Sequence, residues 1–423
     1  MSPAIITLLV LLVMVILFVT EKLPAALVAM LGGSVLVVCG IIEPAKLFSA
    51  FSGSTIVLIT AMMVVGSALF HTGIAAKMAD VLLKVTGTSE NGIMIAFMLV
   101  ATVISSVCSG LAVVAMLLPI VISVSQRAGV SVSRQLIPMS FAASFGCNLT
   151  LMGAASNVVV NGALEDLGVP TMSFFELGKV GIPVCIAGMV FFLTIGKKFL
   201  TPGDSSDKEY LAEYTGGNKA VEFNKPKAIL CLVILAVLLV AMAFDIEWLP
   251  MYLSAAFAAF ILVLTGCIKQ SDAYKSIDLS TLFIVAGMSS VSAGMSSSGA
   301  GELIAETAVK LLGEHPNKLL VLAIIMILVT LLTNAMMNTS CALLVTPLFI
   351  PIVQAFDMNT TAAAIAICVA ASSPFLTPVG SGTNTLIVRP GNLKFMDFFR
   401  PGLGLSIVIL IVSMIFIPIF WPL

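Results

Sequence analysis

Long apolar stretches separated by short polar segments dominate the chain. A helix needs about 20 mostly apolar residues to cross the hydrocarbon core of a bilayer, and ten stretches approach or exceed this length. They are Ala4–Thr20, Pro24–Ile42, Ser54–Phe70, Gln135–Gly162 and Phe174–Lys197 in the first half, then Ala228–Phe244, Leu249–Cys267, Ser280–Ser297, Thr361–Val388 and Pro401–Pro422 in the second. The pattern predicts an all-α polytopic membrane protein.

Two further apolar stretches are interrupted by polar residues in their middle. Residues 92–126 carry the sequence CSG at Cys108–Gly110, and residues 318–355 carry MNTS at Met337–Ser340. Each stretch is either two full spans or one re-entrant hairpin whose tip lies at mid-membrane. We expect re-entrant hairpins, because this topology places most of the Lys and Arg residues on one side of the membrane.

A short amphipathic segment precedes each of these stretches. In Ile74–Val85, apolar residues recur at helical spacing opposite Lys77, Asp80 and Lys84. Its repeat copy places Ile304, Ala308, Leu311 and Leu312 opposite Glu302, Glu306 and Lys310. This spacing is typical of helices that lie flat at a membrane surface.

The chain is duplicated. Ser54–Gly87 aligns without a gap to Ser280–Gly313, keeping Gly73 paired with Gly299 and Gly87 with Gly313. Further on, the spacing T-x-x-G-x-x-x-N recurs at 150–157 and at 377–384. We therefore expect two repeats, residues 1–199 and 228–423, joined by a linker at 200–227. An apolar chain built this way predicts a transporter whose site lies between its halves.

Positive charge decides the topology. If both interrupted stretches are re-entrant, each repeat crosses five times, so the repeats are inverted and the linker lies opposite both termini. With the linker inside, only Lys46, Lys179, Lys310 and Lys318 among the 20 Lys and Arg residues fall outside. This asymmetry follows the positive-inside rule, and it predicts a cytoplasmic linker with both termini outside the cytoplasmic membrane.

Composition narrows the classes of function. The 423 residues are 60% hydrophobic and 10% charged, against about 25% charged in soluble domains. A net charge of -1 leaves no basic face for nucleic acid. The eight cysteines and two histidines stand singly, so we expect neither a His/Cys metal centre nor an enzyme active site.

Four segments place polar side chains and irregular backbone at membrane depth: the two hairpin tips, and breaks within the stretches 135–162 and 361–388. Such backbone is tolerated only where it is buried in protein or lines a watery cavity, so we expect the four to converge. None of them contains a charged residue. Neutral oxygens can hold Na+ and helix N-termini can hold an anion. A small anion balanced by Na+ is therefore the simplest interpretation.

Ser and Thr in membrane helices commonly serve helix packing or bond to their own backbone, so no single serine is diagnostic. Asn157 and Asn384 stand out because a buried amide is costly and the two occupy matching repeat positions.

These segments resemble the divalent anion:sodium symporter family, within the wider ion-transporter superfamily, and in detail its sulfate- and dicarboxylate-permease members. The resemblance rests on CSGLAVVAMLLPIV, TLMGAASNVVVNGAL, NAMMNTSCALLVTPL and SPFLTPVGSGTNTLIV. It implies two Na+ sites around one dianion, and a transport domain that slides past a dimerising scaffold in an elevator mechanism.

The resemblance also implies roles for individual residues. The first Na+ site would use Ser105, Ser109, Gly110 and Gly153. The second would use Thr333, Asn338, Pro378 and Gly380. Substrate contacts would come from Ser109, Asn157, Asn338, Thr339, Thr383 and Asn384. The first hairpin tip, Ser109-Gly110-Leu111, lacks the Asn and Thr oxygens usual in the family.

The sequence thus predicts a Na+-coupled carrier of a small divalent anion, such as a sulfate-like oxyanion or a di- or tricarboxylate, working as a homodimer in the lipid bilayer. Two alternatives stay open: an oxyanion or weak-acid exporter of the arsenite-permease type, and an anion channel.

Overall fold

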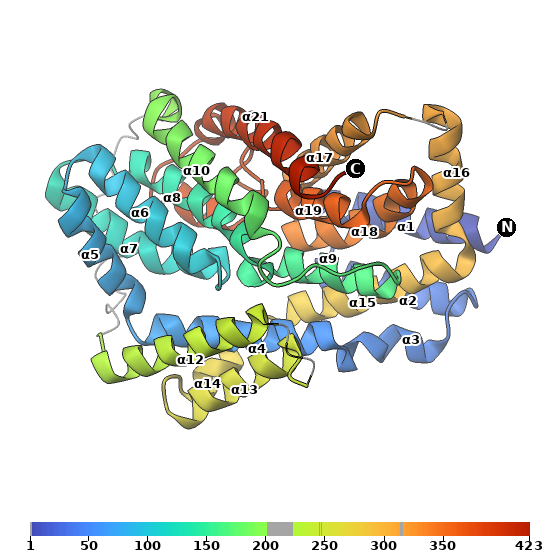
Figure 1. The fold of residues 1–423 in the computed structure, drawn as a ribbon, viewed down its shortest axis with the longest axis horizontal. Helices are drawn as coiled ribbons and strands as arrows, with labels where there is room; N and C mark the ends of the chain where they lie inside the picture. The colour runs from blue at the N-terminus through green and yellow to red at the C-terminus, as the bar shows by residue number, and fades with distance from the viewer. Residues whose placement is uncertain (1, 201–222, 245, 247, 314–315) are drawn as a thin grey trace.

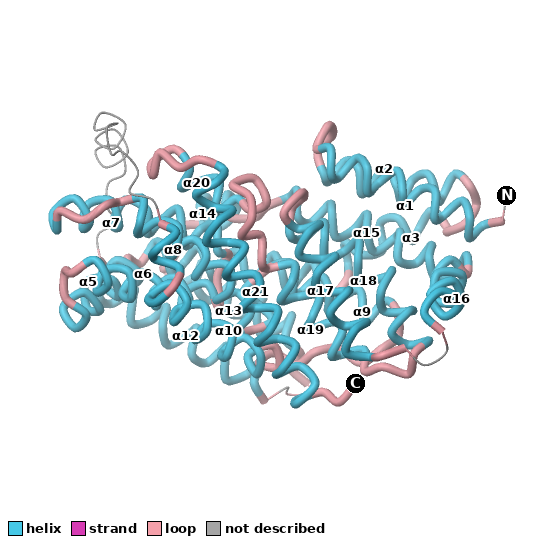
Figure 2. Tube along the Cα trace, turned by 90° about the horizontal axis from the view of Figure 1, so that it is seen from above, coloured by secondary structure: helices cyan, strands magenta, loops and turns pink. Residues whose placement is uncertain are grey.

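The computed structural model describes residues 2–200, 223–244, 246, 248–313 and 316–423. These residues form helices joined by loops, without a β-strand among them (Figure 2), which confirms the all-α prediction. By length and composition, seven segments within them can cross a membrane: Pro3–Thr20, Pro44–His71, Gly110–Ala128, Lys225–Ala243, Leu279–Ser298, Asn338–Ala355 and Phe395–Phe420.

The helices follow the same order in both halves of the chain (Figure 1). The first half contains α1 (Pro3–Thr20), α2 (Ala25–Val38), α3 (Pro44–Ser49), α4 (Ser54–His71), α5 (Ile74–Thr86), α6 (Glu90–Ser105), α7 (Gly110–Ala128), α8 (Ser133–Gly146), α9 (Ala155–Asp166) and α10 (Gly178–Thr194). The second contains α12 (Lys225–Ala243), α13 (Met251–Leu264), α14 (Gln270–Lys275), α15 (Leu279–Ser298), α16 (Ala300–Leu312), α17 (Lys318–Thr333), α18 (Asn338–Ala355), α19 (Thr360–Ala371), α20 (Gly382–Val388) and α21 (Phe395–Phe420).

The helix boundaries differ from the expected stretches in several places, including α21, which begins at Phe395, six residues before the predicted start at Pro401. The six-residue helices α3 and α14 lie in segments that the sequence left as loops, since six residues are too few for a periodic signal to show. Helix α12 begins at Lys225, within the predicted linker. Residues 201–222 of that linker lie outside the described residues, as does His315. The inversion of the two repeats stays a prediction.

Paired glycines set the ends of the two amphipathic helices. Gly73 and Gly299 precede α5 and α16 with φ of 74° and 72°, and Gly87 and Gly313 follow them with φ of 78° and 84°. This left-handed conformation is open to glycine at little cost and disfavoured for other residues. The turns therefore explain why these glycines occur in both repeats.

Two interlocked helix pairs form one part of the molecule. Helix α2 of the first half packs on α15 of the second, and α13 of the second packs in the equivalent way on α4 of the first. With α1 and α12, these helices are called the frame helices below. The α2–α15 crossing is close: a Cβ built on Gly287 would lie 2.5 Å from the carbonyl carbon of Ala29.

A second set, α6–α10 and α17–α21, is called the site helices, and the short or amphipathic helices α3, α5, α14 and α16 belong to neither set. Within each half, α6 packs on α8 and α17 on α19, while α10 and α21 pack on each other across the halves. A cluster of buried phenylalanines strengthens the junction. The ring of Phe141 on α8 lies 4.7 Å from that of Phe375 and 6.4 Å from that of Phe398 on α21, measured between centroids. The site helices thus share one core.

Polar contacts join the C-terminal end of α9 to the frame. The hydroxyl of Ser289 on α15 donates to Asp166 Oδ2 at 2.8 Å, and that of Ser54 on α4 donates to Glu165 Oε2 at 3.3 Å. Asp166 lies beyond the stretch predicted to cross the membrane and keeps contact with solvent. Desolvation by the surrounding protein nevertheless raises the pKa of Asp166, opposed by the Ser289 hydrogen bond.

The close α2–α15 crossing leads to a first prediction. We expect Gly287→Ala to lower the melting temperature, because the added methyl group meets backbone atoms that cannot move aside, and overpacking of this kind costs about 1–3 kcal/mol. Gly66→Ala is the matched control within α4, since its Cβ would meet nothing nearer than Cys108 Sγ at 3.4 Å. Thermal melting of the two variants in detergent checks this. Equal melting temperatures would show that the crossing is not tight.

Candidate functional site

The two breaks in the site helices are built alike. In the first, Asn157 Nδ2 donates to the carbonyl oxygens of Cys147 at 2.9 Å and Thr150 at 3.4 Å. In the second, Asn384 Nδ2 donates to those of Pro374 at 2.7 Å and Thr377 at 3.1 Å. Both asparagines are completely buried. Each side chain satisfies carbonyls that the interrupted helix leaves free, which in an apolar setting removes a large energetic cost.

A threonine in each break holds the tip of the hairpin from the same half. Thr150 Oγ1 donates to the carbonyl oxygen of Ser106. At the equivalent place, Thr377 Oγ1 donates to that of Asn334 at 2.9 Å. The Asn334 side chain adds a second bond, accepting from the backbone N–H of Leu376 at 2.8 Å. Each hairpin tip and the break of its own half therefore form one unit.

Glycine allows these close approaches. A Cβ built on Gly153 would lie 2.2 Å from the carbonyl oxygen of Cys147. On Gly380 it would lie 2.9 Å from Asn334 Cα and 3.1 Å from the carbonyl oxygen of Thr333. Any larger residue would push the break away from its neighbours.

Contacts between the halves join the two units. Helix α7 packs on α20, and its counterpart α18 packs on α9. A Cβ on Gly110 would lie 3.5 Å from Thr383 Cγ2, and Ser140 Oγ on α8 donates to Asn384 Oδ1 at 2.9 Å. The first hairpin tip thereby contacts the second break, and α18, which begins at the second hairpin tip, packs on α9, which begins at the first break.

Four helices begin in these segments: α7 at Gly110, α9 at Ala155, α18 at Asn338 and α20 at Gly382. No side chain caps the N-terminus of α7, α9 or α18, whereas Ser381 Oγ accepts from Thr383 N at 3.3 Å at the start of α20. Uncapped N-termini offer free N–H groups and the positive end of the helix dipole. The arrangement favours a bound anion.

Oxygen atoms gather around Thr333 at the second hairpin tip. Its buried hydroxyl lies 2.9 Å from Asn338 Oδ1 and 2.7 Å from the carbonyl oxygen of Ala371. One hydroxyl proton cannot serve both acceptors fully. A cluster of neutral oxygens with too few protons suits a hard cation such as Na+.

The remaining residues predicted for the second Na+ site lie beside this cluster. Gly380 approaches the Thr333 carbonyl as described above, and its N–H donates to Thr377 Oγ1 at 2.9 Å. The carbonyl oxygen of Pro378 accepts from Thr385 Oγ1 at 2.9 Å. The structure thus brings Thr333, Asn338 and Gly380 together, whereas the Pro378 carbonyl is bonded to Thr385, and Na+ binding by these residues stays a prediction.

The first hairpin tip is poorer in oxygen. Ser105 is buried, and its hydroxyl donates to the Thr102 carbonyl at 3.3 Å. Ser109 is exposed at the start of α7 and caps no helix N–H. Gly110 occupies the place that Asn338 has in the second half, so the side-chain oxygen of an asparagine is missing there. Gly153 lies close to Cys147, as described.

Several buried polar atoms near the breaks lack a hydrogen-bond partner among the described residues. They include both side-chain polar atoms of Asn148, together with Ser156 Oγ, Asn157 Oδ1 and Ser340 Oγ. Unpaired groups of this kind are rare and mark places where a ligand or an ordered water would be stabilised. Asn148 is not among the substrate contacts predicted from the sequence.

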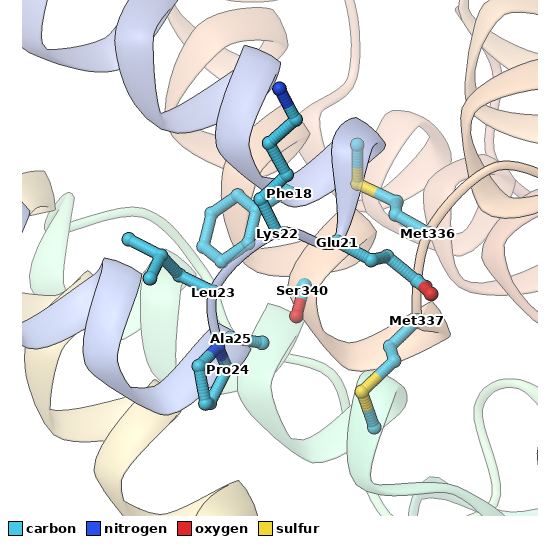
Figure 3. A pocket seen from close by; sticks show the side chains of 9 residues that line it. All are labelled: Phe18, Glu21, Lys22, Leu23, Pro24, Ala25, Met336, Met337 and Ser340. Atoms are coloured by element: carbon cyan, nitrogen blue, oxygen red, sulfur yellow. The ribbon is translucent and has the colours of Figure 1, made fainter.

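A pocket of about 350 Å³ reaches the second hairpin tip (Figure 3). The turn between α1 and α2 lines one side with Glu21 and Lys22, while Met336, Met337 and Ser340 line the other. This turn joins two stretches predicted from the sequence to cross the membrane, so we expect it to lie at a membrane surface. The pocket would then connect the second hairpin tip with one side of the membrane.

The other predicted contacts lie in the same region. Thr339 is half-buried in the first turn of α18. Thr383 is buried, and its hydroxyl lies 2.8 Å from Ser381 Oγ and 3.4 Å from Ser144 Oγ. Asn157 and Asn384 direct their amide nitrogens to the breaks, so the structure gives both a supporting role. Their contact with substrate stays a prediction.

Sequence reasoning missed the parts played by Ser140, Asn334 and Thr377. The repeat alignment held the signal for Thr377, since it pairs with Thr150. No sequence signal identified Ser140, because its repeat counterpart is the apolar Ile367. Among the described residues, no three His, Cys, Asp or Glu side chains form a metal-binding group. Any cation at these tips would be held by neutral oxygens.

Comparison with known proteins places this geometry in context. A family model described as a citrate transporter matches residues 15–299 and 241–422. The chain is 33% identical to the uncharacterized transporter YfbS of Escherichia coli, over 46% of this chain and 31% of that protein. It is 22% identical to the sodium-dependent dicarboxylate transporter SdcS of Staphylococcus saprophyticus, over 95% of this chain and 83% of that one.

The fold also matches a solved transporter. The crystal structure of the Alcanivorax borkumensis YdaH transporter, described as having an unusual topology, superposes with a TM-score of 0.67. The match covers 99% of this chain and 98% of that one at 14% sequence identity. At this identity, the likeness establishes the fold alone.

The hydrogen bonds of Asn384 lead to a second prediction. We expect Asn384→Ala to lower the melting temperature clearly, because each buried carbonyl left without a donor costs about 1–3 kcal/mol. Ser140→Ala is the matched control: it removes only the bond to Asn384 Oδ1 and should have a smaller effect. Thermal melting of both variants checks the order. A wild-type melting temperature for Asn384→Ala would show that the break does not depend on this amide.

Proposed function

The chain belongs to the citrate transporter family, and from that premise we propose that it carries a small divalent anion across the cytoplasmic membrane together with Na+. Its multi-pass helical structure and its relatives are those of a secondary transporter of the citrate, dicarboxylate or sulfate type, and not of an enzyme. The family match also confirms the resemblance to divalent anion:sodium symporters.

One observation carries the proposal of an anionic substrate. Three uncapped helix N-termini lie in the four connected segments that contain no charged residue. Nearby carboxylates would repel an anion, and a nearby lysine or arginine would hold it tightly. Neutral N–H and hydroxyl donors bind an anion more weakly. Weak binding suits a carrier, which must release its substrate in every cycle.

Coupling to Na+ is supported by the oxygen cluster at Thr333, Asn338 and Ala371. A bound cation there would also offset the charge of a neighbouring dianion. The similarity to a transporter named as sodium-dependent agrees with this proposal. We place the stronger Na+ site at the second hairpin tip, because the first lacks an equivalent of Asn338. Family membership favours a coupled carrier over the exporter and channel alternatives.

The Na+ proposal is tested by uptake into proteoliposomes. We expect an inward Na+ gradient, compared with K+, to drive accumulation of citrate, succinate or sulfate. Thr333→Val removes one oxygen while keeping the side-chain shape. It should raise the Na+ concentration for half-maximal uptake by about tenfold, equivalent to about 1.4 kcal/mol.

Thr346→Val is the matched control, since the hydroxyl of this buried threonine on α18 donates to the carbonyl of Ala342 on its own helix and has no partner on another helix among the described residues. Wild-type uptake that does not depend on Na+ would overturn the proposal of Na+ coupling. A wild-type Na+ dependence in Thr333→Val would show that Na+ binds elsewhere.

An unequal set of contacts supports an elevator mechanism. Helix α15 packs along α9 and α18, whereas its repeat counterpart α4 has no comparable contact with α20 and α7. If the site helices move as one body, they would lie against α15 in one state and against its counterpart α4 in the other. The frame helices would stay fixed and form the homodimer.

Paired cysteines test this movement. In a background without the eight native cysteines, Ser289→Cys with Asp166→Cys should cross-link in the present state, where the two side chains are 2.8 Å apart. The repeat-equivalent pair, Met63→Cys with Leu393→Cys, should cross-link only in the opposite state. We expect either cross-link to stop uptake, and reduction to restore it. Each single-cysteine variant serves as the control. Uptake that continues with the first pair fully cross-linked would contradict the movement.

A further inference from the structure

A second pocket lies apart from the proposed transport site. Its volume is about 480 Å³, and it lies between the first turns of α6 and α8 and the segment Gly196–Phe199 that follows α10. Its lining residues are Ser89, Glu90, Asn91, Arg134, Lys197 and Lys198. Neither the substrate nor the Na+ proposal involves them.

The lining carries an excess of positive charge. Arg134 and Glu90 form an ion pair at 2.8 Å, which neutralises the one carboxylate of the pocket. A second guanidinium nitrogen of Arg134 donates to the Lys197 carbonyl at 3.3 Å, while its Nε is buried without a partner among the described residues. The ammonium groups of Lys197 and Lys198 form no ion pair with any described carboxylate. Two positive charges are thus left over.

The N-terminal end of α6 adds to the positive electrostatic potential of the pocket. The first turn of α6 contributes Glu90 and Asn91 to the pocket, and Ser89 Oγ already accepts from Gly92 N at 3.2 Å. N–H groups in a first turn have no acceptor within their own helix. The pocket therefore combines cationic side chains with the positive end of a helix dipole, and both attract an anion.

An apolar surface leads directly to this pocket. Along α10, the side chains of Ile182, Ile186 and Val190 form a stripe at intervals of four residues, with exposed fractions of 55%, 58% and 53%. Ile195 continues the exposed surface at 55%, two residues before Lys197. A free oxyanion would make no favourable contact with this apolar stripe. A lipid whose headgroup occupies the pocket would place its acyl chains along it.

The equivalent place in the second half is built differently. Lys318 lies at the start of α17, but its ammonium donates to the carbonyls of Asp357 at 2.8 Å and Leu423 at 3.1 Å. Thr361 stands where the first half has Arg134, and Pro418 and Ile419 stand where it has Lys197 and Lys198. The basic pocket is therefore a property of one half, and the charge distribution predicts that this half presents it to the cytoplasm.

We propose that this pocket binds the phosphate of an anionic phospholipid from the cytoplasmic leaflet. Lys197 and Lys198 would hold the phosphate oxygens, with the free Nε–H of Arg134 behind them, and the acyl chains would lie on the exposed stripe of α10. The lipid would then be attached to the site helices, away from the frame.

Native mass spectrometry of the protein in a nonionic detergent tests the proposal, with phosphatidylglycerol and phosphatidylcholine as the probes. We expect phosphatidylglycerol to be retained preferentially. Lys197→Gln with Lys198→Gln should weaken its binding by at least about tenfold, since each lysine near an anionic lipid contributes on the order of 1 kcal/mol. Lys197→Arg with Lys198→Arg should preserve it.

The matched control is Lys269→Gln with Lys275→Gln, which removes the same charge from two exposed lysines beside α14. It should leave lipid binding unchanged. Equal losses in the two double variants would overturn the site, because they would report a general charge effect. Displacement of the lipid by inorganic phosphate at millimolar concentration would overturn the lipid assignment and leave a site for a free oxyanion.

Discussion

The structure depends on satisfying the backbone where two membrane helices are interrupted. Irregular backbone in a bilayer leaves N–H and C=O groups that water cannot reach. Here one asparagine amide spans each break, and one threonine hydroxyl ties each break to its hairpin tip. The carbonyls are thereby satisfied, while the N-termini of three of the helices that begin there stay uncapped. The same arrangement that stabilises the breaks leaves donors available for an anion.

Much of the fold could be predicted from the sequence, because each apolar or polar pattern occurs twice, once in each repeat. Apolar stretches located most of the helices, matching residues located the two repeats, and polar residues marked the breaks between α6 and α7 and between α17 and α18. The partners within the site could not be predicted in the same way. Thr377 bonds to a backbone carbonyl, which any residue at position 334 would supply, and Ser140 bonds across the halves to Asn384. Such contacts depend on how the halves pack, and one sequence does not encode this locally.

Burying an amide in a membrane helix without a hydrogen-bond partner is unfavourable in free energy, so the sequence favoured a ligand contact for Asn157 and Asn384. The structure shows that the protein's own carbonyl oxygens accept the hydrogen bonds of both amides. Among the described residues, atoms without a hydrogen-bond partner occur not only on Asn157 but also on Asn148 and Ser156, which the predicted substrate contacts do not include.

The two asparagines differ in one respect, and the difference has a mechanical meaning. Ser140 Oγ donates to Asn384 Oδ1, whereas Asn157 Oδ1 has no partner among the described residues. The repeat counterpart of Ser140 is Ile367, whose side chain carries no donor. The second break is thus held by a side-chain contact between the halves that the first break lacks among the described residues. Two breaks built on the same asparagine therefore differ in how firmly the rest of the protein braces them.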